Sequence, residues 1–202
     1  MRTIERKIYH YDELSDQAQK SAIESMRDEI SNVRIESDSY EYRNTLDKIE
    51  QIFGVKVYNW SVNECNFYFR FKFTNIEEEI ENEPRLLLRY LNTYVLPCID
   101  NQKRYYSKTA RASRRSRILY NKSYEYCLTG CWCDDAVDNA LNNIKQSVKN
   151  KFNARDFVES ILEGFFEQWR NDYEYAISDE CISEEIEAND YEFYENGKPY
   201  FA

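Results

Sequence analysis

Three cysteines, whose thiolates are good zinc ligands, lie close together in the sequence. The segment Cys127-x3-Cys131-x-Cys133 places them within seven residues. A tetrahedral zinc ion would need a fourth ligand, and the candidates for it are Cys65, Cys98, Cys181 and His10. Because the spacing is not that of paired CxxC knuckles, we interpret the three as ordinary, partly buried cysteines. We expect no metal ion and no cofactor.

Paired carboxylates are the second candidate for chemistry, because they can hold Mg²⁺ or share a proton. The pairs are Asp134-Asp135, with Asp138 nearby, and Glu184-Glu185, with Glu187 nearby. A metal-dependent hydrolase that uses Asp134 and Asp135 is therefore one alternative function. Adjacent acids on a helix point about 100° apart, however, and a helix N-terminus attracts negative charge without any catalysis. We therefore favour a capping role for Asp134 and Asp135.

Nucleophilic hydrolysis and nucleotide chemistry lack their usual motifs in this sequence. His10 is the only histidine, and no Gly-x-Ser-x-Gly elbow occurs. The four glycines, at positions 54, 130, 164 and 197, form neither a GxGxxG motif nor a P-loop. We therefore expect a protein that is not an enzyme.

The segment 103–122 is the only basic block, with eight Lys and Arg residues and no acidic residue. Tyr105, Tyr106 and Tyr120 are interspersed among its basic residues, a composition typical of surfaces that bind phosphates and stack on bases. A nucleic-acid-binding regulatory protein is therefore a second alternative function. Its contacts would be Arg111, Arg114, Arg115 and Arg117. The plainer interpretation is that the positive charge of this block balances the negative charge of the acidic C-terminal part of the chain.

Acidic residues are concentrated between positions 156 and 195. This stretch contains fourteen Asp and Glu residues and one arginine, so its local net charge is 1 − 14 = −13. Carboxylates arrayed on helices can imitate the phosphates of DNA and occupy a basic groove of a partner protein. A solvated helix face is the plainer interpretation. If the stretch does bind a partner, the contacts that we predict are Glu163, Glu167, Glu184, Glu185 and Glu187.

The whole chain is acidic and rich in aromatic residues. Its 202 residues carry a formal net charge of −10, and 16% are Phe, Trp or Tyr, so we expect basic protein surfaces as partners rather than duplex nucleic acid. No run of 18 apolar residues and no signal peptide is present, so we expect a cytoplasmic protein that does not bind membranes. In that compartment the six cysteines are expected to be free thiols.

The hydrophobic periodicity predicts helices and a few strands. Apolar residues recur every four positions from Leu14 to Ile30, from Tyr42 to Phe53 and from Phe157 to Ile177, which predicts three helices, and Pro84 is expected to start a fourth. Alternating residues predict a strand over 3–11 and a hairpin over 55–73. The pair Asn196-Gly197, in which both residues can take a positive φ, predicts a C-terminal hairpin with these two residues at the centre of its turn. We therefore expect a helix-rich α+β fold, one compact domain over 1–202, in which these strands form one small, mainly antiparallel sheet.

Three segments resemble a family of small acidic proteins that phages and prophages encode and that are sometimes labelled antitoxin-like. Residues 8–24 are similar to its strand and "ELS-x-x-A-x-x-x-A" helix, and 130–135 are similar to its Gly, Trp, Cys, double-Asp segment with Cys131 inserted. Residues 173–198 contain the third similar stretch. The resemblance implies a phage accessory protein that inhibits a host defence effector, such as a CRISPR nuclease complex, by binding it in the host cytoplasm, as anti-CRISPR proteins do. It assigns no catalytic residue.

Overall fold

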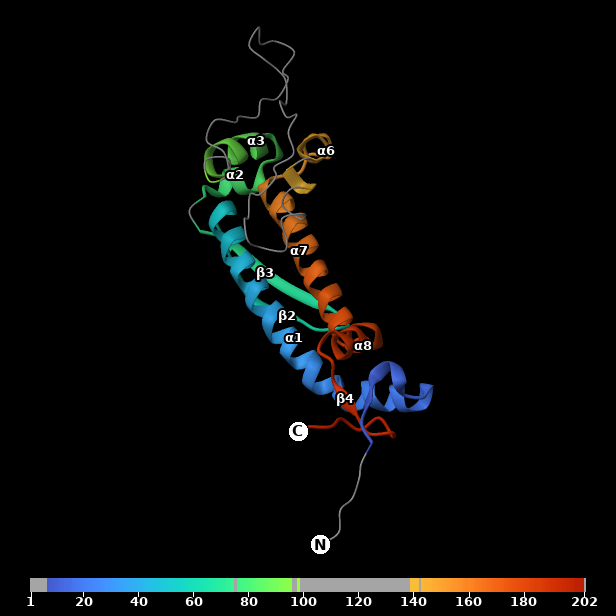
Figure 1. Cartoon of the computed structure of the whole chain (residues 1–202). Coiled ribbons are helices and arrows are strands. Elements are labelled where there is room, and N and C mark those ends of the chain that lie inside the picture. Colours follow the sequence, from blue (N-terminus) through green and yellow to red (C-terminus); the bar gives the residue numbers. More distant parts are fainter. Residues whose placement is uncertain (1–6, 75, 96–97, 99–138, 142, 202) are drawn as a thin grey trace. The chain divides into compact units, whose positions relative to one another are not determined.

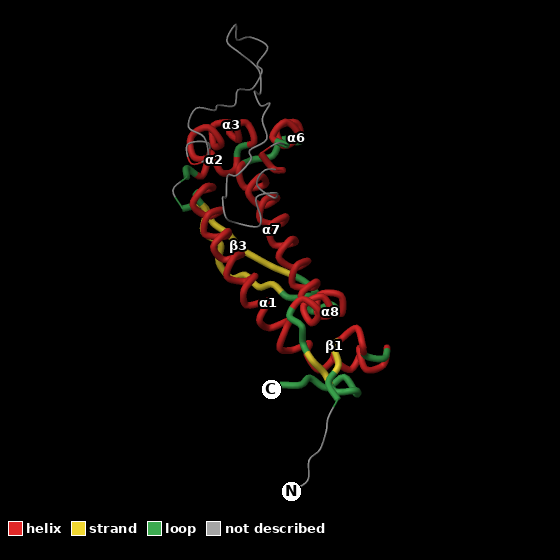
Figure 2. Tube along the Cα trace, viewed as in Figure 1, coloured by secondary structure: helices red, strands yellow, loops and turns green. Residues whose placement is uncertain are grey.

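The computed structural model describes residues 7–74, 76–95, 98, 139–141 and 143–201. These residues are mostly helical, as the secondary-structure colouring of Figure 2 shows. They also carry four strands in two small antiparallel sheets. The predicted helix-rich α+β class is confirmed. By contact density the chain divides into two compact units, one of residues 1–39 and 171–202 and the other of residues 40–170. The prediction of one domain over the whole chain stays a prediction.

Helix α1 and helix α7 each contribute residues to both units (Figure 1). The first unit also contains β1, a short 3-10 turn, α8 and β4. In chain order the elements of the first unit are β1 (Tyr9–His10), the 3-10 turn (Tyr11–Glu13), the first part of α1 (Asp16–Phe53), the last part of α7 (Ala154–Ala176), α8 (Asp179–Ala188) and β4 (Glu192–Phe193).

The second unit contains the β2–β3 hairpin and a series of short helices between the remaining parts of α1 and α7. These elements are β2 (Val55–Val62), β3 (Phe67–Phe73), α2 (Glu78–Asn82), a 3-10 turn (Pro84–Leu86), α3 (Leu87–Tyr90), a π-helical turn (Leu91–Val95) and α6 (Ile144–Lys149). The helix expected after Pro84 is thus present as three consecutive helical segments of different pitch.

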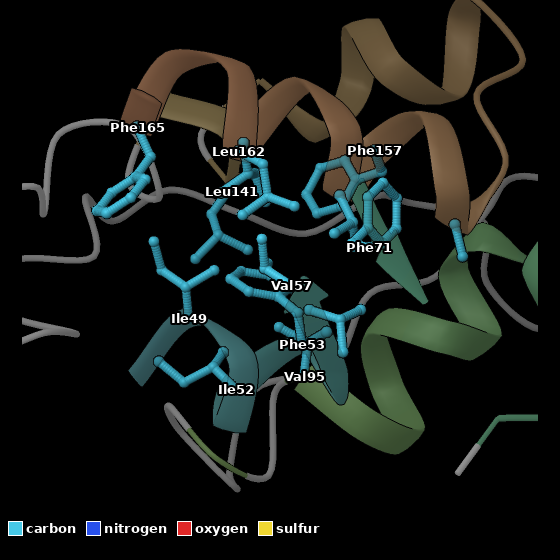
Figure 3. Close-up of a cluster of buried hydrophobic side chains, with 14 of the residues drawn as sticks. Ile49, Ile52, Phe53, Val57, Phe71, Val95, Leu141, Phe157, Leu162 and Phe165 are labelled. Carbon is cyan, nitrogen blue, oxygen red and sulfur yellow. The ribbon is translucent and has the colours of Figure 1, made fainter. Parts of the chain in front are cut away.

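The core of the second unit forms where the hairpin meets α1 and α7. Apolar side chains from the three elements point toward one another in Figure 3, including Ile49, Phe53, Val57, Phe71 and Phe157. The four-residue period of α7 brings Ile161, Phe165 and other fully buried residues to one side of the helix, which is the pattern the sequence predicts.

A smaller core holds the first unit together. Apart from Ile23, its α1 residues are those that the period of four predicts, and they pack with three apolar residues of α8 and β4. The members of this core are Leu14, Ala18, Ala22, Ile23, Met26, Ile30, Ile182, Ile186 and Phe193.

The prediction of one sheet is wrong in its connectivity, because the strands form two separate pairs. β1 pairs with β4, whereas β2 pairs only with β3. A carboxylate closes the outer edge of β2, since the Val57 N–H donates to Glu50 Oε1 at 2.7 Å. Of the strand predicted over 3–11, residues 3–6 lie outside the described residues; Tyr9 and His10 form β1, and the chain turns into the 3-10 helix at Tyr11.

The C-terminal hairpin forms, with different turn geometry from the one predicted. The Tyr194 N–H donates to the Lys198 carbonyl at 2.9 Å, the Gly197 N–H donates to the Tyr194 carbonyl at 2.8 Å, and Phe193 bridges Pro199. Only Gly197 has a positive φ, 77°, and Asn196 does not. This is the three-residue loop in which a single glycine takes the left-handed conformation.

Candidate functional site

Three glutamates form a stripe along the solvent side of α7 in the second unit. Glu159, Glu163 and Glu167 are four residues apart and exposed. The rise of an α-helix separates successive members by about 6 Å along the axis. None of the three carboxylates has a hydrogen bond or an ion pair with another residue in the part of the chain that the structure describes. We call this set the α7 acidic stripe; it contains the two predicted contacts Glu163 and Glu167 and also Glu159, which was not predicted.

Two of the predicted contacts on α8 are engaged within the first unit instead. Glu185 is half-buried and accepts a hydrogen bond from Arg34 Nη1 at 2.9 Å. Glu184 accepts one from the Tyr175 hydroxyl at 2.6 Å, and this bond raises the pKa of Tyr175 to about 12. The Arg34 guanidinium also lies over the Tyr175 ring, 5.5 Å from its centroid. These contacts tie α8 to α1 and α7, so a binding role for Glu184 and Glu185 would compete with them.

The third predicted contact on α8, Glu187, lies at an open pocket of about 400 Å³ in the first unit. Carboxylates, phenols and one imidazole surround this pocket, a set of groups that suits a cation better than an anion. Burial raises the pKa of the Tyr11 hydroxyl above its ordinary value, and the charges of Glu187 and Asp179 act in the same direction. The residues that line the pocket are His10, Tyr11, Asp12, Ile186, Glu187, Asp190 and Tyr191.

The remaining predicted site residues lie outside the described residues. They are the arginines Arg111, Arg114, Arg115 and Arg117, the cysteines Cys127, Cys131 and Cys133, and the acids Asp134, Asp135 and Asp138.

Within the described ranges, no group of three or more His, Cys, Asp or Glu residues is arranged to hold a metal ion. The three cysteines in these ranges, Cys65, Cys98 and Cys181, are free thiols. Among the helices that the structure describes, none combines the length and the apolar character needed to cross a membrane.

Comparison with protein-family models, curated proteins and solved structures finds no match to this chain. The function therefore has to be inferred from the chemistry of the described side chains. Two acidic features, the α7 acidic stripe in one unit and the pocket in the other, offer negative charge to a partner. Such features attract basic groups and fix their positions.

Proposed function

We propose that this protein is a non-enzymatic inhibitor that binds a basic surface of a host defence effector, such as a CRISPR nuclease complex. The observation that carries the proposal is the α7 acidic stripe. Its three charges have no counter-charge among the described residues, whereas the charge of Glu185 is matched by Arg34. Unmatched like charges in a row raise the free energy of the isolated protein, and a basic partner would relieve that repulsion.

A groove that normally holds nucleic acid is the kind of partner surface that suits this stripe. CRISPR effectors hold their heteroduplex in a positively charged channel. One DNA strand carries a charge about every 3.4 Å, so the stripe, with a charge about every 6 Å, has roughly half that linear density. The stripe alone is therefore a weak imitation of DNA. The pocket beside Glu187, in the first unit, is a separate place at which a Lys or Arg side chain of a partner would fit.

The phage setting of the proposal comes from the resemblance of residues 8–24, 130–135 and 173–198 to phage accessory proteins. A nucleic-acid-binding regulator that uses the 103–122 segment stays the alternative, because the arginines that would make its contacts lie outside the described residues.

A pull-down from nuclease-treated host lysate, at low and at high salt, tests the proposal. We expect the tagged protein to retain one defence effector at low salt and to lose it at high salt. The triple variant Glu159→Lys, Glu163→Lys and Glu167→Lys should lose the effector at both. Because these positions are exposed, the variant should stay folded, which circular dichroism checks.

The matched control is Asp28→Lys, Glu29→Lys and Glu36→Lys on α1, where the side chains are also exposed. Both triple variants change the net charge from −10 to −10 + 6 = −4. Retention of the effector by the control but not by the α7 variant supports a contact at the stripe. Equal loss in both variants would mean that only the total charge matters, and recovery of nucleic acid alone from untreated lysate, with no defence effector, would contradict the proposal.

A further inference from the structure

The outward face of the β2–β3 hairpin combines three cations with two tyrosine rings. The five side chains alternate with inward apolar ones along the two strands, and all of them are exposed. We call this set the hairpin basic face. Its members are Lys56, Tyr58, Tyr68, Arg70 and Lys72.

The arrangement of charge on this face does not stabilise the hairpin. Lys56 lies directly opposite Lys72 in the pairing register, and like charges in that position are destabilising. Only Lys56 has a counter-charge, Glu50 Oε2 at 2.6 Å from its Nζ. Arg70 and Lys72 form no ion pair with the described residues. Arg70 and Lys72 are exposed, so their charges are available to an anionic partner.

The two rings on the hairpin basic face are also available to a partner. Tyr58 is 45% exposed and Tyr68 is 52% exposed, and neither ring contacts another aromatic ring among the described residues. Phe67, Phe69 and Trp60, by contrast, turn inward and pack on α7, with the Phe69 and Phe166 centroids 5.0 Å apart. The hairpin therefore has one aromatic side that builds the core and one that faces the solvent.

We propose that the hairpin basic face binds single-stranded nucleic acid. Along β3, Tyr68, Arg70 and Lys72 follow one another at intervals of about 6.8 Å, and Tyr58 lies opposite Arg70 on β2. Exposed rings stack on unpaired bases while neighbouring cations contact the phosphates. A duplex keeps its bases stacked inside, out of reach of the two rings. Acidic proteins also contact cations and tyrosine rings, so the test includes an acidic competitor. The residues of this face are different from those of the α7 acidic stripe and of the 103–122 segment.

Fluorescence anisotropy with labelled oligo-dT and oligo-rU of about 16 nucleotides tests the proposal and separates DNA from RNA. Three phosphate contacts predict a slope of log affinity against log salt of about −2, so affinity should fall about 20-fold between about 50 and about 200 mM NaCl. The double variant Arg70→Ala and Lys72→Ala should reduce the slope to about −0.7. The double variant Tyr58→Ala and Tyr68→Ala should weaken binding about tenfold or more while leaving the slope unchanged.

Two control variants separate this surface from total charge and from the basic segment. Arg43→Ala and Lys48→Ala on α1 remove the same charge from exposed positions and should leave affinity within about twofold of the wild type. Alanine at Arg111, Arg114, Arg115 and Arg117 should leave the effects of the hairpin variants in place.

Three results would overturn the proposal. The first is no anisotropy change at the lower salt concentration. The second is wild-type affinity in both hairpin variants. The third is binding that the tyrosine variant does not weaken and that polyglutamate displaces, because such binding would assign the face to an acidic protein instead.

Discussion

Two features of the structure require glycine at position 197: the conformation of its own backbone and the close approach of Ala18. Its φ of 77° is left-handed, and a Cβ at this position would collide with the backbone carbonyl oxygen of Ala18 on α1. Strain at such a φ and overpacking each cost on the order of 1–3 kcal/mol. We therefore expect Gly197→Ala to lower the free energy of unfolding by roughly 2 kcal/mol or more, measured by urea denaturation.

The neighbouring exposed residue provides the control for this prediction. Lys198→Ala should change the unfolding free energy by less than about 0.5 kcal/mol, because surface substitutions away from special geometry have small effects. If Gly197→Ala changes the free energy of unfolding as little as Lys198→Ala does, the C-terminal turn does not approach α1 closely.

Asp38 is the residue for which the structure predicts a pH effect. Burial raises the pKa of its carboxyl above the ordinary value, and Asp172 acts in the same direction, while Arg34 opposes both. The folded protein thus binds this proton more tightly than the unfolded chain does, and ionisation of Asp38 at neutral pH costs stability. Asp38→Asn, which cannot ionise, should be more stable than the wild type at neutral pH. The difference should shrink as the pH falls below about 4, where the unfolded carboxyl is also protonated.

Urea denaturation at neutral pH and below about pH 4 measures this difference in stability between Asp38→Asn and the wild type. The control is Asp28→Asn, which changes an exposed carboxylate on the same helix. A variant Asp38→Asn that is less stable than the wild type at neutral pH would mean that the ion pair with Arg34, 3.8 Å away, outweighs the cost of burial.

At the scale of elements, α1 shows where sequence periodicity stops being informative. The period of four predicts the buried residues of α1 up to Ile30 and again from Tyr42. Because the pattern is interrupted between these two residues, the sequence predicts two helices. The structure has one helix of 38 residues from Asp16 to Phe53. Residues 31–39 contain no glycine or proline that would break it, and Val33 in this part is 69% exposed. A helix can continue through a segment that buries few apolar side chains, because backbone hydrogen bonds, rather than apolar burial, maintain it there.

The candidate site could be predicted only where its residues are near one another in sequence. The spacing of Glu163 and Glu167 indicates one helix face, and both are exposed on α7. The pocket was not predictable, because residues 10–12 and 186–191 reach it from opposite ends of the chain. The hydrogen bond between Arg34 and Glu185 spans 151 positions for the same reason. Contacts at that separation depend on tertiary packing, for which a single sequence carries no direct signal.

The packing of the hairpin on α7 depends on Phe166, which is fully buried. Its ring centroid lies 5.0 Å from that of Phe69 and 6.0 Å from those of Trp60 and Phe67. Replacement of a buried Phe by Ala leaves a cavity and costs about 3–5 kcal/mol. We expect Phe166→Ala to lose roughly that much stability in urea denaturation followed by tryptophan fluorescence. Tyr68→Ala, on the opposite face of β3, should cost less than about 1 kcal/mol, and equal losses would contradict this assignment of faces.

At the scale of the whole molecule, the net charge of −10 should make stability increase with salt. Like charges on a compact protein repel one another, and about 0.15 M salt shortens the screening length from about 30 Å at 0.01 M to about 8 Å. Salt also weakens ion pairs, but most of those described are partly or largely exposed, and such pairs contribute about 0–1 kcal/mol each. Relief of repulsion should therefore dominate.

We expect the melting temperature, measured by differential scanning fluorimetry, to rise by about 2–4 °C as NaCl increases from about 0.01 to about 0.15 M, which corresponds to about 1 kcal/mol. KCl should give the same rise, because screening does not depend on which monovalent cation is present. The variant with lysine at positions 159, 163 and 167, whose net charge is −4, should show a smaller rise. A melting temperature that falls with salt would mean that ion pairs such as Arg34–Glu185 outweigh the repulsion among the acids, and that the α7 acidic stripe carries little of the electrostatic strain that we assign to it.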